Sequence, residues 1–232
     1  MVLRKREFPS GVMFTRFRPQ AGRLALPDVC CDLVWVHERL TLVGPTSRGE
    51  AIPWVGADVQ LMNIDPLVAR AWLGVPLIHF VDRHIALSDI DKTASSILSH
   101  LFAWGRAVEL VRQHRTVPPA QTRAVAAARI LRSGLSVRRT ARLVGWSERQ
   151  LERVFADQFG LSPRCYRRVL RMRRAVQAVG TGKSLALAAV DEGYSDQPHF
   201  TREVRALMGY SPREVIPHVG KIQDAIACTR HY

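Results

Sequence analysis

The chain is poor in cysteine and in the residues that bind metals. Its four cysteines are Cys30, Cys31, Cys165 and Cys228, and no two of them form a C-x-x-C pair. Together with His37 they make no recognisable ligand set, which argues against a zinc site. Neighbouring residues of a strand point to opposite faces, so Cys30 and Cys31 suit neither a shared metal nor a disulfide with each other. We therefore expect buried structural thiols, no metal and no cofactor.

Long apolar runs are also lacking. The basic start of the chain is followed by Glu7, Pro9 and Gly11, which interrupt any apolar core of a secretory leader. No long apolar helix accompanies the positive charge of the chain, so a membrane is not expected as a partner. These absences predict a cytoplasmic protein.

Acidic residues are scarce in one half of the chain. The sequence holds 34 Lys and Arg against 20 Asp and Glu, a formal net charge of +14. Residues 1–112 contain 13 basic and 11 acidic residues, whereas residues 113–232 contain 21 and 9. An excess confined to one half is the electrostatic footprint of a domain that binds a polyanion. Arginine makes up most of the excess and suits bidentate contacts with phosphates and base edges.

An internal repeat organises the basic half. One copy runs from Ser136 to Pro163 and the other from Ser184 to Pro212. Each predicts a short helix with a small central residue, a glycine four positions later, and a second helix with apolar residues at three-four spacing. Those paired positions are Ala141 and Gly145, then Ala189 and Gly193. Glycine suits the left-handed backbone of a tight turn, so each copy has the layout of a helix-turn-helix.

The second helix of each copy has an exposed polar face. Ser147, and Ser195 with Asp196, are placed to cap these helices. The exposed positions are Arg149, Gln150, Glu152 and Arg153 in the first copy and Gln197, Pro198, His199 and Arg202 in the second. Arginine and glutamine suit guanine and adenine edges in a major groove. For one hairpin alone, a merely solvated face would be an equal alternative, but two copies in a basic region favour DNA.

These motifs resemble a known family. The matching residues are A141-x-x-x-G145, L151-x-R153-x-F155, G160-L-S-P163-x-x-Y166, G193-Y194-S-D196, F200-x-R202 and G209-Y-S-P212. With them, residues 120–217 resemble the DNA-binding domain of AraC/XylS-family bacterial transcription regulators. The resemblance implies two helix-turn-helix units joined by a long helix, each unit addressing one major groove. It also implies recognition roles for Arg149, Glu152, Arg153, Gln197, Pro198, His199 and Arg202.

The helix that joins the two units is expected to begin with Ser162 as cap and Pro163 at its first position. About seventeen residues at ~1.5 Å each span ~25 Å, near the ~34 Å between successive major grooves on one face of DNA. Its arginines either contact phosphates or solvate the helix, with equal weight. We include Arg164 among the expected DNA contacts, with Ser147 and Gln150.

The first half predicts a small antiparallel sheet or barrel with helices, so the fold class is α+β with an all-α second half. The expected strands are residues 12–17, 24–36, 40–43 and 52–62, each close to turn residues. Asp65 and Pro66 should open a helix that Gly74 ends. A second, longer helix is expected over residues 88–114, for packing on the sheet or for a dimer interface.

The first half also carries a resemblance, through L26-P-D-V-C-C-D-L-V-W35, V43-G-P45, L73-G-V-P76 and D82-R-x-x-x-L-x-D89. These motifs resemble an N-terminal domain of obscure role that often precedes such DNA-binding domains. We expect a sensor or dimerisation domain over residues 1–115, a break at Thr116–Pro119, the DNA-binding domain over 120–217, and a tail over 218–232.

Aromatic and histidine side chains of the first half are candidates for a ligand site. Trp35, His37, Trp54 and Trp72, with His79, could line a small-molecule cavity, since aromatic rings with a few polar groups are typical linings. The alternative is that the tryptophans fill a core and the histidines lie at its edge, which we favour for any individual residue.

The sequence therefore predicts a non-enzymatic, sequence-specific regulator that binds double-stranded DNA across two successive major grooves. A small-molecule effector, RNA polymerase and a second copy of the chain remain open as partners. One alternative is a DNA-modifying, alkyl-accepting protein with Cys30 or Cys31 as acceptor, although no ligand set activates the thiol. Another is an effector-free dimeric DNA-binding protein.

Overall fold

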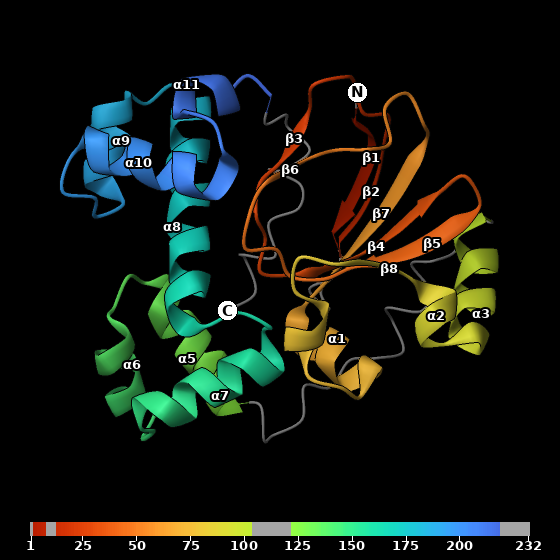
Figure 1. The fold of residues 1–232 in the computed structure, drawn as a ribbon, viewed down its shortest axis with the longest axis horizontal. Coiled ribbons are helices and arrows are strands. Elements are labelled where there is room, and N and C mark those ends of the chain that lie inside the picture. Colours follow the sequence, from red (N-terminus) through yellow and green to blue (C-terminus); the bar gives the residue numbers. More distant parts are fainter. Residues whose placement is uncertain (1, 8–12, 104–121, 219–232) are drawn as a thin grey trace.

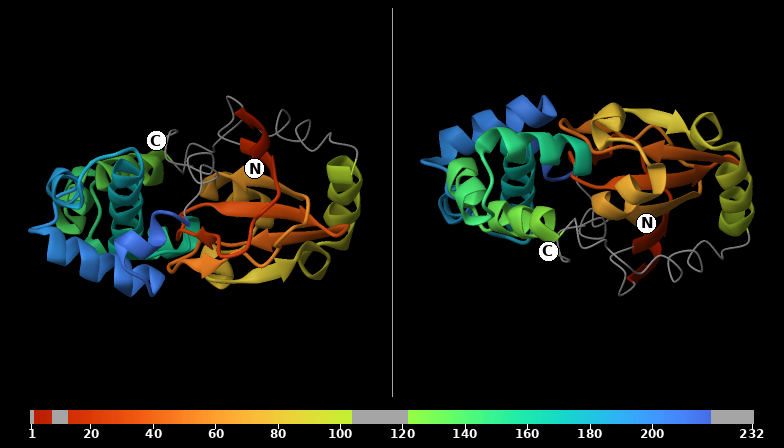
Figure 2. Two further views of the ribbon diagram at one scale, coloured as in Figure 1. Left: turned by 90° about the horizontal axis from the view of Figure 1, so that it is seen from above. Right: turned by 90° about the horizontal axis from the view of Figure 1, so that it is seen from below.

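The computed structural model describes residues 2–7, 13–103 and 122–218. Residues 2–7 and 13–103 form a β-rich half and residues 122–218 form a helical half, which lie beside each other (Figure 1). Views from above and below show the helical half in contact with one side of the β-rich half (Figure 2). The expected α+β class, with an all-α second half, is confirmed.

Six strands make the main sheet, in the order β1-β2-β7-β4-β5-β8, and all neighbouring strands are antiparallel. Their bounds are Val2–Glu7 (β1), Met13–Phe17 (β2), Cys31–Val36 (β4), Arg39–Val43 (β5), Val59–Ile64 (β7) and His84–Ala86 (β8). The central strands are apolar on both faces, because both faces of the sheet are covered. Leu33 pairs with Leu42 on one side and with Met62 on the other.

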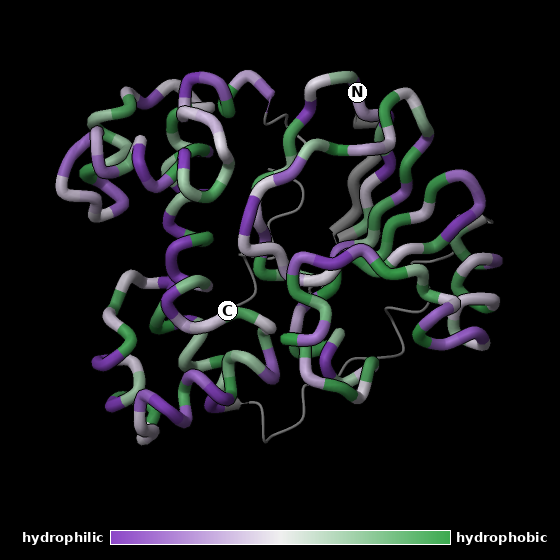
Figure 3. Tube along the Cα trace, in the orientation of Figure 1, coloured by the Kyte–Doolittle hydropathy of each residue, from purple (hydrophilic) through white to green (hydrophobic). Residues whose placement is uncertain are grey.

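The two faces of the sheet bury different clusters. Cys31 and Leu33 of β4 lie on the face that packs against α1 (Pro66–Leu73), α2 (Leu87–Ile90) and α3 (Lys92–Ala103). Val34 and Val36 alternate to the other face, where they pack with Phe17 and Trp54. In Figure 3 hydrophobic residues recur along these strands, and hydrophobic and hydrophilic residues alternate along the helices.

The helices of the β-rich half partly follow expectation. Asp65 caps α1 by accepting from the Leu67 amide at 2.8 Å, and Gly74 ends it with φ 70°. The single helix expected from residue 88 is wrong, because Asp91 breaks it with φ −150° and ψ 107°. The Asp91 carboxylate accepts from the Ala94 amide at 2.9 Å and so starts α3 as a new helix. Residues 104–114, the break at 116–119 and the tail from 219 onward lie outside the described residues.

The expected strand over residues 24–36 is also interrupted. Leu24–Ala25 (β3) pairs with Glu50–Ala51 (β6) in a separate two-stranded sheet, and β4 begins only at Cys31. Between them lies a loop, Leu26–Cys30, which we call the docking loop. Pro27 has no amide hydrogen to donate to a strand ladder. The Asp28 carboxylate instead accepts from the amides of Val29 and Cys30, at 2.6 and 3.3 Å.

The helical half consists of α5 and two helical hairpins joined by one long helix. The bounds are Thr122–Arg132 (α5), Val137–Leu143 (α6), Glu148–Gln158 (α7), Pro163–Gly180 (α8), Leu185–Asp191 (α9), Gln197–Met208 (α10) and Pro212–Val215 (α11). α6 and α7 lie at one end of α8, and α9 and α10 lie at the other (Figure 1). The sequence predicted the two hairpins and the long helix that joins them.

The β-rich half contributes to both hydrophobic cores of the helical half. Val29 and Cys30 of the docking loop, with Leu67 of α1, belong to the core around α7. Leu26, at the other end of the docking loop, belongs to the core around α10. The docking loop therefore lies along α8 and contacts both hairpins.

Candidate nucleic-acid interface

Both hairpins have the same turn. Gly145 and Gly193 have φ of 69° and 72°, which only glycine adopts without strain. One residue later, the amides of Trp146 and Tyr194 donate to carbonyls five residues back, Ala141 and Ala189, at 2.9 Å in each copy. Both alanines are buried, so the two helices of each hairpin cross closely at that point. The repeat in the sequence is thus a repeat in backbone geometry.

The second helix of each hairpin is capped differently. In α7, Ser147 Oγ accepts from the Gln150 amide at 3.1 Å, and Gln150 Oε1 accepts from the Ser147 amide at 2.9 Å. This capping box engages one oxygen of Gln150 and leaves its amide nitrogen to act as a donor. In α10 the cap is Asp196, which accepts from the His199 amide at 2.6 Å.

Each hairpin has its own core behind the exposed face. Phe155 stacks on Phe159 with ring centroids 4.6 Å apart, and both rings contact Tyr166 of α8 edge-on at 5.3 Å. In the second hairpin Val204 occupies the position of Phe155, and it is buried together with Phe200. The smaller side chain is therefore accommodated without exposing this core.

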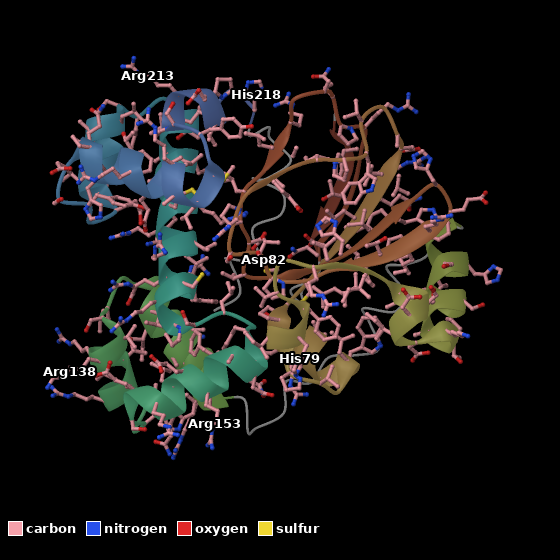
Figure 4. All side chains as sticks on the ribbon, viewed as in Figure 1. His79, Asp82, Arg138, Arg153, Arg213 and His218 are labelled. Carbon is pink, nitrogen blue, oxygen red and sulfur yellow. The ribbon has the colours of Figure 1, made fainter. Side chains whose placement is uncertain are left out.

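The expected DNA contacts all reach the surface of the helical half. The exposed members are Ser147, Arg149, Gln150, Glu152, Arg153, Arg164, Gln197, Pro198 and Arg202, and His199 is half-buried. The His199 ring lies against Tyr194 at 5.2 Å and within 3.1 Å of Ser195 Oγ. Figure 4 shows Arg138 and Arg153 at the outer edge of the first hairpin, away from the sheet.

The β-rich half leaves this surface uncovered because it contacts the other ends of the two helices. At α7 it contacts the carboxyl end, where Arg70 donates to Asp157 at 3.0 Å. At α10 it again contacts the carboxyl end, where the Gly49 amide donates to the Leu207 carbonyl at 2.8 Å. The amino-terminal halves of α7 and α10 therefore stay accessible together.

The arginines of α8 have a role that the sequence did not indicate. Arg168 and Arg171 both donate to Glu203 of α10 at 3.2 Å, and Arg174 donates to Glu192 beside α9 at 2.6 Å. Arg167 reaches the Leu135 carbonyl, and Arg173 donates to the Pro27 carbonyl at 2.9 Å. These side chains tie both hairpins and the docking loop to α8, a role beside the phosphate contact or solvation that was expected for them.

Glu203 supplies a test of this role for the α8 arginines. Burial alone would raise the pKa of its carboxyl, but the hydrogen bonds and charges of Arg168 and Arg171 outweigh burial and lower that pKa. A carboxyl whose pKa is lower in the folded state stabilises the fold at pH values above its ordinary pKa, near 4.5. This stabilisation is lost as the pH falls through the folded-state pKa. We expect Glu203→Gln to lower the free energy of unfolding by about 1–2 kcal/mol at pH 7.

The measurement is urea unfolding at pH 7 and at pH 3, where the deficit of the Glu203→Gln variant should shrink. Glu152→Gln, on the exposed face of α7, is the matched control and should change stability by less than about 0.5 kcal/mol. Equal effects of the two substitutions at pH 7 would contradict the role assigned to Glu203.

The four candidate ligand residues are not brought together. Trp35 stacks on Phe102 at 6.3 Å on the helix-covered face of the sheet, while His37 is exposed in the turn between β4 and β5. Trp72 lies on α1 with 36% of its surface exposed. Trp54 alone of the four lines the cavity of about 70 Å³ that the described residues form between the sheet and α8.

The walls of this cavity include residues that the sequence did not single out. Asp28 of the docking loop, Asp32 of β4 and Arg173 of α8 line it, together with His218 from the end of the helical half. Figure 4 places His218 between α11 and β3. The one local sequence signal for this site was Pro27 followed by Asp28 inside an apolar run, because such a pair interrupts a strand.

The environment of the cysteines does not favour an alkyl acceptor. Cys31 is a fully buried free thiol, and burial raises its pKa well above the ordinary value, with nearby Asp32 adding to the effect. Such a thiol forms little of the thiolate that would be the nucleophile. Cys30 is also buried, in the core around α7, and it is disulfide-bonded, so the free thiol expected at this position is wrong. Within the described residues no group of His, Cys, Asp and Glu is arranged to hold a metal ion, and no helix there is long and apolar enough to cross a membrane.

Comparison with known proteins also identifies a helix-turn-helix domain. Residues 140–216 match a family described as a helix-turn-helix domain. The HTH-type transcriptional regulator ArgR of Pseudomonas aeruginosa is 39% identical over 69 residues, which are 29% of this chain and 21% of that protein. The chain thus spans about a fifth of the length of this curated relative.

Two solved structures extend the comparison. A transcriptional regulator with an AraC-type DNA-binding domain, from Chromobacterium violaceum, is 33% identical over 42% of this chain and 92% of its own length, with a TM-score of 0.39. A single-residue variant of apo ToxT from Vibrio cholerae is 10% identical, with a TM-score of 0.50 over 93% of this chain and all of its own, a likeness of fold alone. On the sequence likeness, residues 140–216 form a helix-turn-helix domain of the AraC type.

Proposed function

We propose that one chain binds a specific double-stranded DNA site by placing α7 and α10 in two successive major grooves. The observation that carries this proposal is that the amino-terminal halves of both helices are exposed at opposite ends of α8. The 18 residues of α8 span about 27 Å at 1.5 Å each. That length is comparable with the roughly 34 Å between successive major grooves on one face of DNA.

The exposed side chains divide into base-reading and positioning roles. Arg153 and Arg202 occupy equivalent positions of the repeat, each seven residues before the glycine that follows its helix, and each can donate twice to a guanine edge. Arg149, Gln197 and the free amide nitrogen of Gln150 add donors, and Pro198 offers an apolar contact. Ser147 and Arg164 suit phosphates, which position the protein without reading sequence.

We further propose that the β-rich half regulates this binding in response to a small molecule. It contacts both hairpins at once, through the docking loop, through Arg70 and through Gly49. The cavity beside the docking loop is bounded by both halves, so a molecule bound there would contact both. The likeness to regulators whose names describe transcription supports a role in controlling transcription.

The test of the proposed function is selection of bound sequences from a random DNA library with the full chain. We expect enrichment of a site with two short blocks of fixed sequence whose centres are about 10 bp apart. Binding should weaken steeply with salt, because the phosphate contacts release counterions. A library that emerges unenriched, with affinity equal for all sequences, would contradict sequence-specific recognition.

A further inference from the structure

The cavity between the two halves is lined by both charged and apolar side chains. Strands β2, β4 and β7 contribute Phe17, Val34 and Leu61, and Trp54 also lines the cavity. Asp28 and Asp32 lie on the same cavity, next to Arg173. A site that combines an apolar wall with a few charged groups is typical of those that bind small organic molecules.

The carboxylates of this cavity are not all matched by cations. Asp28 lies 3.4 Å from Arg173, and Glu50 pairs with His84 at 2.8 Å. Asp32 receives one hydrogen bond, from the neutral amide of Asn63 at 2.7 Å, and forms no ion pair within the described part of the chain. Arg23 also lines the cavity, where its guanidinium donates to the Pro217 carbonyl at 3.4 Å. Asp32 is therefore the carboxylate whose one hydrogen-bond partner is neutral, although the charges of Arg173 and His84 lie near enough to act on it.

Asp28 also has unused hydrogen-bonding capacity. Its Oδ1 accepts from two backbone amides, but its Oδ2, which is buried, has no hydrogen-bond partner in the described residues. The side chain of Asp28 is 10% exposed. A buried carboxylate oxygen without a hydrogen bond is costly. The charge of Arg173, 3.4 Å from this oxygen, does not fully offset the cost, since burial still raises the pKa of the Asp28 carboxyl.

The protonation behaviour of Asp32 agrees with a missing positive charge. Burial, with the nearby charge of Asp28, raises the pKa of the Asp32 carboxyl to about 7. The ionised form is thus poorly compensated by the protein alone. A cation brought to the cavity would favour this ionised form, since an opposite charge nearby stabilises a carboxylate.

We propose that this cavity binds a small organic cation, a primary amine with a short apolar body, whose ammonium group lies between Asp28 and Asp32. The inference rests on the proposed ligand response and names the chemical class of its ligand. The ammonium has three donors, enough for Asp28 Oδ2 and the Asp32 carboxylate together. Phe17, Leu61 and Trp54 contact the apolar body.

The bound amine would also strengthen the contact between the halves. Arg173 belongs to α8, and it reaches the docking loop through the Pro27 carbonyl and Asp28. The ammonium group offsets the negative charge of Asp32, the second carboxylate beside this contact, so Arg173 is not displaced. The occupied cavity then holds the docking loop against α8, and with it the relative orientation of the two hairpins.

The experiment is calorimetric titration of the full chain at pH 8 with propylammonium, propanol and propionate, three probes of similar size and different charge. We expect heat of binding from propylammonium and none from the other two. Asp32→Asn keeps an oxygen for the Asn63 amide but removes the charge, so it should weaken amine binding about tenfold or more. Asp58→Asn is the matched control, because Asp58 pairs with Arg16 on the surface, and it should bind the amine like the unchanged chain.

Three outcomes would overturn the proposed amine site: propionate binding as well as the amine, propanol binding as well as the amine, or unchanged amine binding in Asp32→Asn. Circular dichroism of each variant shows whether it is folded, and the unchanged chain with the three probes remains decisive if a variant is not. DNA binding is measured in parallel with the selected site. Asp32→Asn should keep it, so loss of the amine site and loss of DNA recognition are separate results.

Discussion

Replacing Arg153 or Arg202 with alanine is expected to weaken binding to the selected DNA site by about 1–3 kcal/mol, roughly 5- to 150-fold. Both side chains are exposed on the amino-terminal halves of α7 and α10, at equivalent positions of the repeat. An arginine that reads guanine donates two hydrogen bonds, and alanine leaves the base edge unpaired. Each substitution should relax specificity in one block of the site and leave the other block unchanged. Equilibrium binding to the site and to single-base variants, at one salt concentration, measures both effects.

The control removes the same charge elsewhere. Arg39 is exposed on β5, in the half that holds no predicted DNA contact, and Arg39→Ala should change affinity by less than about 0.5 kcal/mol. An equal loss of affinity on every DNA sequence would show that Arg153 or Arg202 serves only the phosphate backbone. An unchanged affinity in both arginine variants would remove the helices α7 and α10 from the interface.

Gly160→Ala is expected to destabilise the chain by about 1–3 kcal/mol more than Gly209→Ala, its counterpart in the repeat. The two glycines have φ of 73° and 76°, so alanine at either position carries a similar strain of about 1–2 kcal/mol. An added Cβ at 160 would lie 2.9 Å from Val81 Cγ2 and 3.0 Å from the Leu77 carbonyl oxygen, in the β-rich half. At 209 it would meet nothing within 4 Å.

The difference between these two variants isolates the contact between the halves, because the local strain cancels. Urea unfolding of both full-length variants gives the two free energies. Equal destabilisation would mean that the first hairpin does not pack against Leu77 and Val81 as described, and the proposed coupling of the halves would lose its basis.

Local signals in the sequence account for most of the helical half. Gly145, Gly193 and the serine and aspartate caps act within a few residues of where they stand, so their effects can be predicted without knowing the fold. Because the sequence is repeated, the turn glycine and the helix caps each occur twice. Helix α1 was predicted for the same reason, because Asp65 and Gly74 cap it from its two ends.

Contacts between distant residues explain what could not be predicted. Residues 26–30 have the apolar content of a strand, but their partner is α8, more than a hundred residues later. From the sequence, the arginines of α8 suited phosphate contact and solvation equally, because their carboxylate partners, Glu203 and Glu192, lie elsewhere in the chain. Similarly, Trp35 and Trp54 belong to opposite faces of the sheet, which composition does not reveal.

The most direct test of the central claim is photo-cross-linking from the two predicted recognition helices. A photoreactive phenylalanine derivative replaces Arg153 in one variant and Arg202 in another, and each is irradiated on the selected site. The proposal predicts cross-links in two major grooves about 10 bp apart on one face of the duplex. Cross-links from both positions to the same base pairs, or from one position alone, would contradict the binding of two successive grooves by one chain.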